Sequence, residues 1–109
     1  MSRRVNKHRD LLRFLATAPR NTQKEVLSNS SKEFIETICE ICLNILKSRI
    51  NLTKKDIGKL GRHKRDIRKL ANKKVAINHK RRIVQKGGFI SSLLGPLLGS
   101  LLAPILGRK

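Results

Sequence analysis

Apolar side chains recur at intervals of three and four residues between positions 32 and 50, the spacing that gathers them on one side of a helix. The sequence therefore predicts a helix over residues 32–50, with a capping box formed by Ser30 and Glu33 at its start. Acidic side chains come early in this segment and basic ones late, which complements the helix dipole. The apolar members are Phe34, Ile35, Ile38, Ile41, Cys42, Ile45, Leu46 and Ile50.

Shorter helices are predicted before this segment. One covers residues 5–16 and ends ahead of Pro19, because the residue before a proline avoids helical geometry. A single turn of helix fits residues 22–27, and Ser28 and Asn29 end it. The N-terminal part of the chain is thus expected to hold one short helix and an added turn.

A third long helix is predicted in the segment after residue 52. Thr53 and Asp56 resemble an N-cap with an early acid, while Gly58 and Gly61 weaken the helix. Its apolar edge consists of Ile57, Leu60, Ile67, Leu70 and Ala71. A fourth helical stretch covers residues 75–85, and strand patterns are poor throughout. The expected fold is all-α, a small helical bundle with a basic helical segment and an apolar tail kinked by glycine and proline.

Charge is distributed in blocks along the 109 residues. Lysine and arginine total 26 against 7 acids, which gives a formal net charge of +19. The net charge is +5 over residues 1–20, zero over 21–50, +12 over 51–86 and zero over 87–107. We divide the chain into a basic N-terminal arm with a short helix (1–29), a helical basic domain (30–86) and a hydrophobic tail (87–109). This balance indicates a partner that is a polyanion or an anionic surface.

Cations recur every few residues in the segment 51–86. Such a density can neutralise backbone phosphates and release their counterions. No helix-turn-helix, zinc-finger or homeodomain pattern is evident, so binding is expected to be independent of base sequence. The candidate phosphate contacts are Lys54, Lys55, Lys59, Arg62, Lys64, Arg65, Arg68, Lys69, Lys73, Lys74, Lys80, Arg81 and Arg82.

Cys39 and Cys42 have C-x-x-C spacing in the middle of the predicted 32–50 helix. A closed zinc site needs four ligands, and the three histidines lie far apart in the sequence. We interpret the cysteines as small packing residues, with a disulfide or a metal role as the alternative. No Ser/His/acid or paired-carboxylate arrangement is present, so the chain is predicted to be no enzyme and to need no cofactor.

The tail repeats a four-residue unit from Ser92 to Gly107, in which a small residue or proline precedes two aliphatic residues and another small residue. As one helix, the uncharged residues 88–107 would span about 30 Å, enough for a bilayer core. Their small residues would form a ridge that lets helices approach closely. The tail has three alternatives: a membrane-active or interfacial segment, a true anchor, or a segment packed against protein. The candidate membrane or self-association residues are Leu94, Gly95, Leu98, Gly99, Leu102 and Ala103.

The order of these parts resembles that of a viral protein family. A very basic region runs into Lys86, Gly87 and Gly88, and an apolar tail rich in Leu, Gly and Pro follows at once. This order is similar to the precursor of the adenovirus core protein X (mu) and its counterparts in adintoviruses and Maverick/Polinton elements. The resemblance implies condensation of double-stranded DNA, a place in the virion core and host nucleus, and processing at Gly87 and Gly88 by a viral protease.

The sequence thus favours non-enzymatic, sequence-nonspecific binding and condensation of double-stranded DNA, as in a viral core protein. The tail would contact a membrane, a capsid protein or another copy of the chain. One alternative is a small membrane-active or pore-forming viral protein whose basic block binds lipid headgroups. Another is a basic protein associated with RNA, because the cations alone do not distinguish the two nucleic acids.

Overall fold

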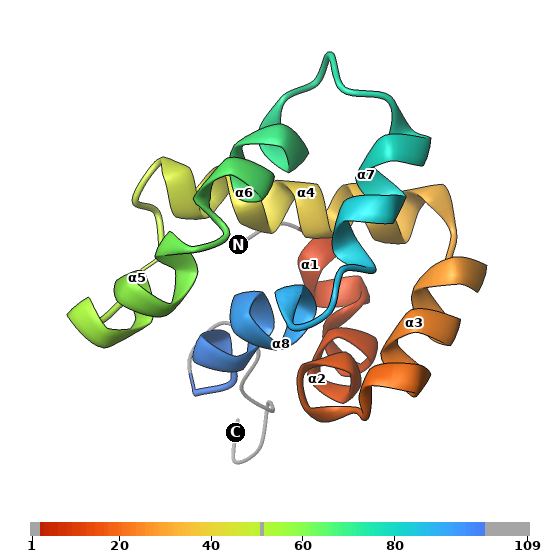
Figure 1. Ribbon diagram of the computed structural model, residues 1–109, viewed down its shortest axis with the longest axis horizontal. Coiled ribbons are helices and arrows are strands. Elements are labelled where there is room, and N and C mark those ends of the chain that lie inside the picture. The colour runs from red at the N-terminus through yellow and green to blue at the C-terminus, as the bar shows by residue number, and fades with distance from the viewer. Residues whose placement is uncertain (1–2, 51, 100–109) are drawn as a thin grey trace.

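Helices make up the regular structure of the chain, as the computed structural model in Figure 1 shows. The structure describes residues 3–50 and 52–99, and no strand occurs in those ranges, so the all-α prediction is confirmed. The helices are α1 (Arg3–Lys7), α2 (Arg9–Thr17), α3 (Arg20–Asn29), α4 (Lys32–Leu46), α5 (Lys54–Gly61), α6 (Lys64–Ala71), α7 (Ile77–Val84) and α8 (Phe89–Leu94), followed by the 3-10 helix η1 (Gly95–Leu97).

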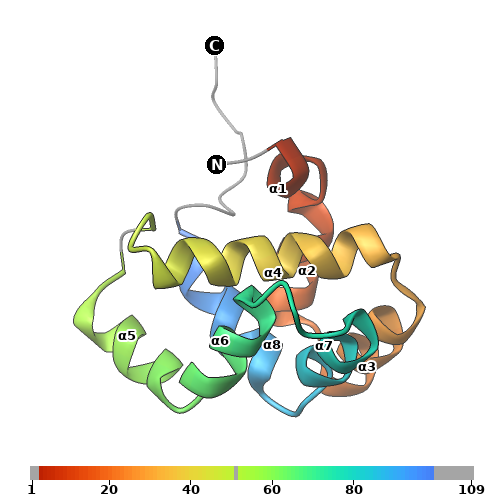
Figure 2. The same ribbon diagram turned by 90° about the horizontal axis from the view of Figure 1, so that it is seen from above.

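The longest helix, α4, runs across the molecule, and α6 and α7 pack along it (Figure 2). Its N-cap is Ser31, whose Oγ accepts a hydrogen bond from the Phe34 amide at 3.1 Å. The predicted capping box of Ser30 and Glu33 is therefore wrong by one residue. Ser30 instead follows the end of α3, where its hydroxyl donates to the carbonyl of Leu27 at 2.9 Å.

The predicted helix over residues 32–50 is one turn too long at its C-terminal end. The chain leaves α4 in a Schellman motif, with Ser48 in the left-handed region at φ 57°. The Ser48 amide donates to the Ile45 carbonyl at 3.1 Å, and the Arg49 amide donates to the Asn44 carbonyl at 2.9 Å. These two bonds satisfy carbonyls at the helix end and turn Ile50 back toward α5 and α6.

The other predicted helices exist with altered limits. The helix expected over residues 5–16 divides at His8 into α1 and α2, and the single turn expected over 22–27 extends into the ten-residue α3. The long helix expected after Thr53 divides at Arg62 and His63 into α5 and α6. The fourth stretch, 75–85, contains α7.

One hydrophobic core takes side chains from the N-terminal arm, the basic segment and the tail. The tail supplies Phe89, Ile90, Leu93, Leu94 and Leu97, each exposed by no more than 1 %. Its helix α8 packs mainly against α2. The largest fully buried side chains elsewhere in the core are Leu12, Leu15, Leu27, Phe34, Ile35, Ile38, Ile41, Leu70 and Ile83.

A buried glutamine joins the helices α2, α3 and α8. The side-chain amide of Gln23, on α3, donates to the Leu15 carbonyl of α2 at 2.7 Å and to the Ser91 hydroxyl of α8 at 2.9 Å. Gln23 is 6 % exposed, so its amide nitrogen is satisfied inside the protein rather than by solvent. This bond fixes the position of α8 against the N-terminal helices.

The described part of the tail is not one continuous helix. As one helix, residues 88–107 would have carried a ridge of small residues, but α8 ends at Leu94 and Pro96 stands in a 3-10 turn, so that ridge is interrupted after Leu94. Leu94 is fully buried and cannot serve as an exposed membrane contact in this fold. Leu98 packs against the core and Gly95 is half-buried, whereas Gly99 is exposed. The two remaining candidates, Leu102 and Ala103, lie outside the described residues.

Among residues 3–50 and 52–99, no helix combines the length and the hydropathy that crossing a membrane requires. The apolar stretch up to Leu97 packs against protein, which was one of the three alternatives for the tail.

The Gly87–Gly88 junction starts the core helix α8. Gly88 takes a positive φ of 80°, a conformation that glycine adopts without the steric cost of a side chain. Gly87 leaves room for the guanidinium of Arg20, which would collide with a Cβ at this position. Both glycines are exposed, and processing at this junction remains a prediction.

Candidate nucleic-acid interface

The basic segment begins with a well-formed helix cap. The Asp56 amide donates to the Thr53 hydroxyl oxygen at 3.1 Å, and the Thr53 amide donates to the Asp56 carboxylate at 3.3 Å. This reciprocal pair is a capping box, and it confirms the predicted N-cap at Thr53. It orders α5, which carries Lys54, Lys55 and Lys59 as exposed side chains.

The break between α5 and α6 turns the second helix onto the core. Arg62 and His63 occupy this break, and the His63 ring meets the buried Phe89 ring edge-on, with centroids 5.4 Å apart. The tail helix α8 thus packs beneath the turn in the basic segment. Burial, followed by the positive charge of Arg62, lowers the pKa of His63 despite the opposing effect of Asp66.

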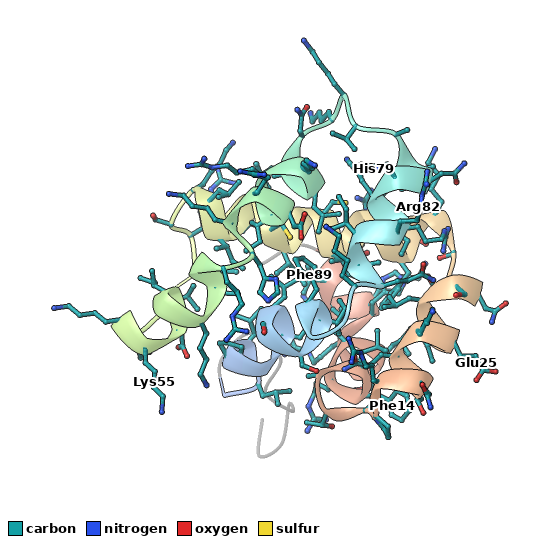
Figure 3. All side chains as sticks on the ribbon, in the orientation of Figure 1. Phe14, Glu25, Lys55, His79, Arg82 and Phe89 are labelled. Atoms are coloured by element: carbon teal, nitrogen blue, oxygen red, sulfur yellow. The ribbon has the colours of Figure 1, made fainter. Side chains whose placement is uncertain are left out.

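Helix α6 has one apolar face and several exposed cations on its other sides. Ile67 and Leu70 are 2 % and 0 % exposed and pack against α4, while Arg65, Arg68 and Lys69 are exposed. Their spacing explains the division, because residues three or four apart share one side of a helix. Burying the apolar pair therefore aims the cations at solvent (Figure 3).

A basic hollow of about 550 Å³ lies against this cationic side. Its charged lining residues are all lysine or arginine, so it offers concentrated positive potential with no acidic side chain to oppose it. The lining residues are Gly61, Arg62, Lys64, Arg65, Arg68, Lys69 and Asn72. A hollow of this composition suits phosphate groups, because each lysine or arginine can donate a charge-assisted hydrogen bond to a phosphate oxygen.

The thirteen predicted phosphate contacts do not form one continuous surface. Five of them line the basic hollow on α6 and the preceding turn. Lys55 and Arg82 lie on opposite sides of the molecule in Figure 3. The structure therefore concentrates the candidate interface at α6 and distributes the other exposed cations around it, namely Lys54, Lys55, Lys59, Lys73, Lys74 and Arg82.

Two predicted phosphate contacts serve the fold instead. Arg81 Nη1 donates to the carbonyl oxygens of Leu27 and Ser30, at 2.9 and 2.8 Å, and so satisfies the C-terminal end of α3. Lys80, a residue of α7, is buried, with 8 % of its surface exposed. These positions correct the sequence prediction, because equal spacing along the chain does not show which cations turn inward.

Two lining residues of the basic hollow were missed by the sequence prediction. Gly61 ends α5 and Asn72 follows the end of α6, so the two residues bracket the cationic helix. The Asn72 side-chain oxygen accepts a hydrogen bond from the Lys74 amide at 2.9 Å, which shapes the loop after α6. Their turn-forming character was the available signal, and charge alone does not reveal them.

The basic N-terminal arm faces acidic residues of α4. Lys7 pairs with Glu33 at 3.3 Å, and Arg3 and Arg4 share a hollow with Glu33 and Glu40. The acids offset part of the positive charge there. The N-terminal arm is therefore a weaker candidate for phosphate binding than α6.

Cys39 and Cys42 pack as the sequence interpretation expected. Cys42 is fully buried in the core, and Cys39 packs against that core. Burial raises the pKa of both thiols, although the positive charge of Lys80 opposes the rise. Protonated thiols are poor nucleophiles and poor metal ligands, so this environment favours packing over chemistry.

No metal-binding cluster of three or more His, Cys, Asp or Glu side chains occurs in the described part of the chain. Comparisons with protein-family models, with curated proteins and with solved structures find no match to this chain.

Proposed function

We propose that this protein binds duplex DNA through the phosphate backbone, without base-sequence preference, and condenses it. The observation that carries the proposal is the basic hollow, in which five cations of α6 and the preceding turn face the same space. Cations that neutralise phosphates release condensed counterions, and this release drives binding to any sequence. Exposed cations beyond the hollow would bridge further phosphates as strands are brought together.

The aromatic content supports a duplex over single-stranded nucleic acid. Proteins that hold single strands stack successive bases on aromatic side chains. The chain has three phenylalanines and neither tyrosine nor tryptophan. Phe34 and Phe89 are buried in the core, which leaves Phe14 as the exposed ring. The family resemblance adds double-stranded DNA in a virion core and the host nucleus as the setting of the proposed function.

The test compares two charge-reduced variants of the same net charge. In the first, Arg62, Lys64, Arg65, Arg68 and Lys69 are changed to Gln; in the second, Lys54, Lys55, Lys59, Lys73 and Lys74 are changed to Gln. Affinity for duplexes of unrelated sequence is measured over a range of salt concentrations. Because each phosphate contact contributes about −0.9 to the slope of log K against log[salt], losing five should flatten the slope by about 4.5.

The hollow variant should lose more slope and more affinity than the control variant, and the loss should be the same for all sequences. Circular dichroism should show unchanged helix content in both, because the replaced side chains are exposed. Equal losses in the two variants would show that overall charge governs binding and would refute the assignment to α6. A strong preference for one base sequence would refute the nonspecific mode.

A further inference from the structure

A second hollow, of about 640 Å³, lies between the end of α4, the connection to α5, and helices α5 and α6. Most of its wall is aliphatic, which sets it apart from the basic hollow, and we call it the apolar groove. Leu46 is 41 % exposed and Ile57 is 58 % exposed, so large apolar side chains remain open to solvent there. The aliphatic lining residues are Ile45, Leu46, Ile50, Leu52, Ile57, Leu60 and Ile67.

The charged side chains that line the apolar groove are both cations, Lys64 and Arg68. Both are exposed, and both also line the basic hollow, so the aliphatic wall adjoins the cationic side of α6. The acids next to the wall residues in the sequence are engaged elsewhere: the Asp56 carboxylate caps α5, and Asp66 pairs with Lys86 at 3.2 Å. The groove therefore complements a ligand that carries negative charge beside an aliphatic surface.

A second copy of this chain does not supply such a ligand. The chain has 26 basic residues against 7 acids, and its most apolar segment, 87–107, carries no charge. Two copies that met at this groove would bring like charges together, which opposes association. A segment of a different protein, with acidic side chains beside aliphatic ones, satisfies both the wall and the two cations.

We propose that the apolar groove binds an acidic amphipathic helix of a partner protein. Such a helix places apolar side chains at positions i, i+3, i+4 and i+7 into a hydrophobic groove. Extended peptides instead add to the edge of a sheet, and residues 3–50 and 52–99 contain no strand that could accept one. The partner's aliphatic side chains cover Leu46 and Ile57, and its carboxylates pair with Lys64 and Arg68. This inference does not depend on DNA binding.

The test uses two synthetic peptides of identical composition, built from Leu, Glu, Gln and Ala. In the ordered peptide, leucines occupy positions i, i+3, i+4 and i+7 with glutamates beside them; in the scrambled peptide, the leucines are spread around the helix. Each peptide is fluorescently labelled, and its binding to the full chain is measured by anisotropy without DNA. Both peptides carry the same negative charge, so general attraction to a protein of +19 is equal for both. The ordered peptide should bind about tenfold more tightly.

One pair of variants tests the aliphatic wall. Ile57→Gln replaces an exposed groove residue, and Phe14→Gln replaces a similarly exposed ring on α2 (51 %) that does not line the groove. Ile57→Gln should weaken binding of the ordered peptide about tenfold, whereas Phe14→Gln should leave it unchanged. Circular dichroism should show the same helix content in both variants.

A second pair of variants tests the two cations. Changing Lys64 and Arg68 to Gln removes both charges from the groove, and changing Lys73 and Lys74 to Gln removes the same charge from exposed positions outside it. The first change should weaken the ordered peptide about fivefold and reduce the dependence of its binding on salt. The second should weaken it less than about twofold, because salt screens distant exposed charges.

Equal affinity for the ordered and scrambled peptides would overturn the proposal, because charge alone would then account for binding. Equal responses to Ile57→Gln and Phe14→Gln would overturn it as well, since the peptide would then occupy no particular surface. Phosphatidylglycerol vesicles that bind through Ile57 while the ordered peptide does not bind would assign the groove to lipid and refute the peptide. Preference for the ordered peptide that falls with Ile57→Gln and with loss of the two cations supports the proposal, whatever the affinity for DNA.

Discussion

Removing the tail from Gly88 onward should unfold this protein. The deletion takes away five side chains that are at most 1 % exposed: Phe89, Ile90, Leu93, Leu94 and Leu97. Full burial of one such side chain contributes about 1.5–3 kcal/mol, so the five together contribute about 8–15 kcal/mol. A domain of this kind has a total stability of about 5–15 kcal/mol. The loss is comparable to the whole stability of such a domain, so the truncated chain should not fold cooperatively.

The assay is urea unfolding followed by far-ultraviolet circular dichroism, without DNA. A chain that ends after Gly99 is the control, because it keeps every buried side chain of the described core. It should unfold cooperatively, whereas the chain that ends after Gly87 should show no cooperative transition. A graded version substitutes one residue: Leu93→Ala should cost about 2–5 kcal/mol, and the exposed Leu46→Ala less than about 1 kcal/mol. A cooperative transition in the shorter chain would refute the assignment of α8 to the core.

Two further substitutions test local features of the fold. Ser48 holds a left-handed conformation that glycine adopts freely, so Ser48→Gly should raise the free energy of unfolding by about 1 kcal/mol. An unchanged urea midpoint would contradict that argument. The pKa of His63 is lowered, so the unfolded chain takes up the proton first as pH falls below about 6.5, and the folded state should lose stability in that window. His63→Gln should flatten this pH dependence, and an equal slope in the variant and the original chain would count against it.

Helix positions could be predicted because the apolar periodicity of this chain agrees with its core. Ile35, Ile38, Ile41 and Cys42 repeat at helical spacing, and all four are buried in the structure. The cap at Thr53 was also predictable, since a hydroxyl three residues before an acid is a local signal that needs no tertiary contact. Local patterns that tertiary packing reinforces are the ones that sequence reasoning recovers.

The end of α4 and the break between α5 and α6 could not be predicted from apolar spacing. A Schellman motif usually has glycine at its left-handed position, and here Ser48 takes that place without the usual signal. The break at His63 is packed against Phe89, which lies 26 residues further along the chain. Spacing within the basic segment does not reveal this contact, so the segment reads as one long helix.

The candidate site was predictable in composition but only partly in geometry. The density of cations between residues 51 and 86 identified the segment, and five of the thirteen predicted contacts line one hollow. The direction of each side chain depends on the helix that packs beside it. Arg81, for example, turns toward the end of α3 because unsatisfied carbonyls lie there. Lysines and arginines that look equivalent in the sequence therefore differ in whether the fold leaves them exposed to a ligand or engages them within the protein.

The tail and the basic segment depend on each other through α6. Its cations face the basic hollow only while Ile67 and Leu70 are buried, and the core that buries them includes the tail helix α8. A net charge of +19 opposes this compact arrangement, because like charges repel within a small volume. A bound polyanion would remove much of that repulsion and stabilise the folded state by mass action. The apolar tail that resembles a separate module in the sequence is thus, on this argument, what makes a stable surface of the proposed phosphate-binding kind attainable for so basic a chain.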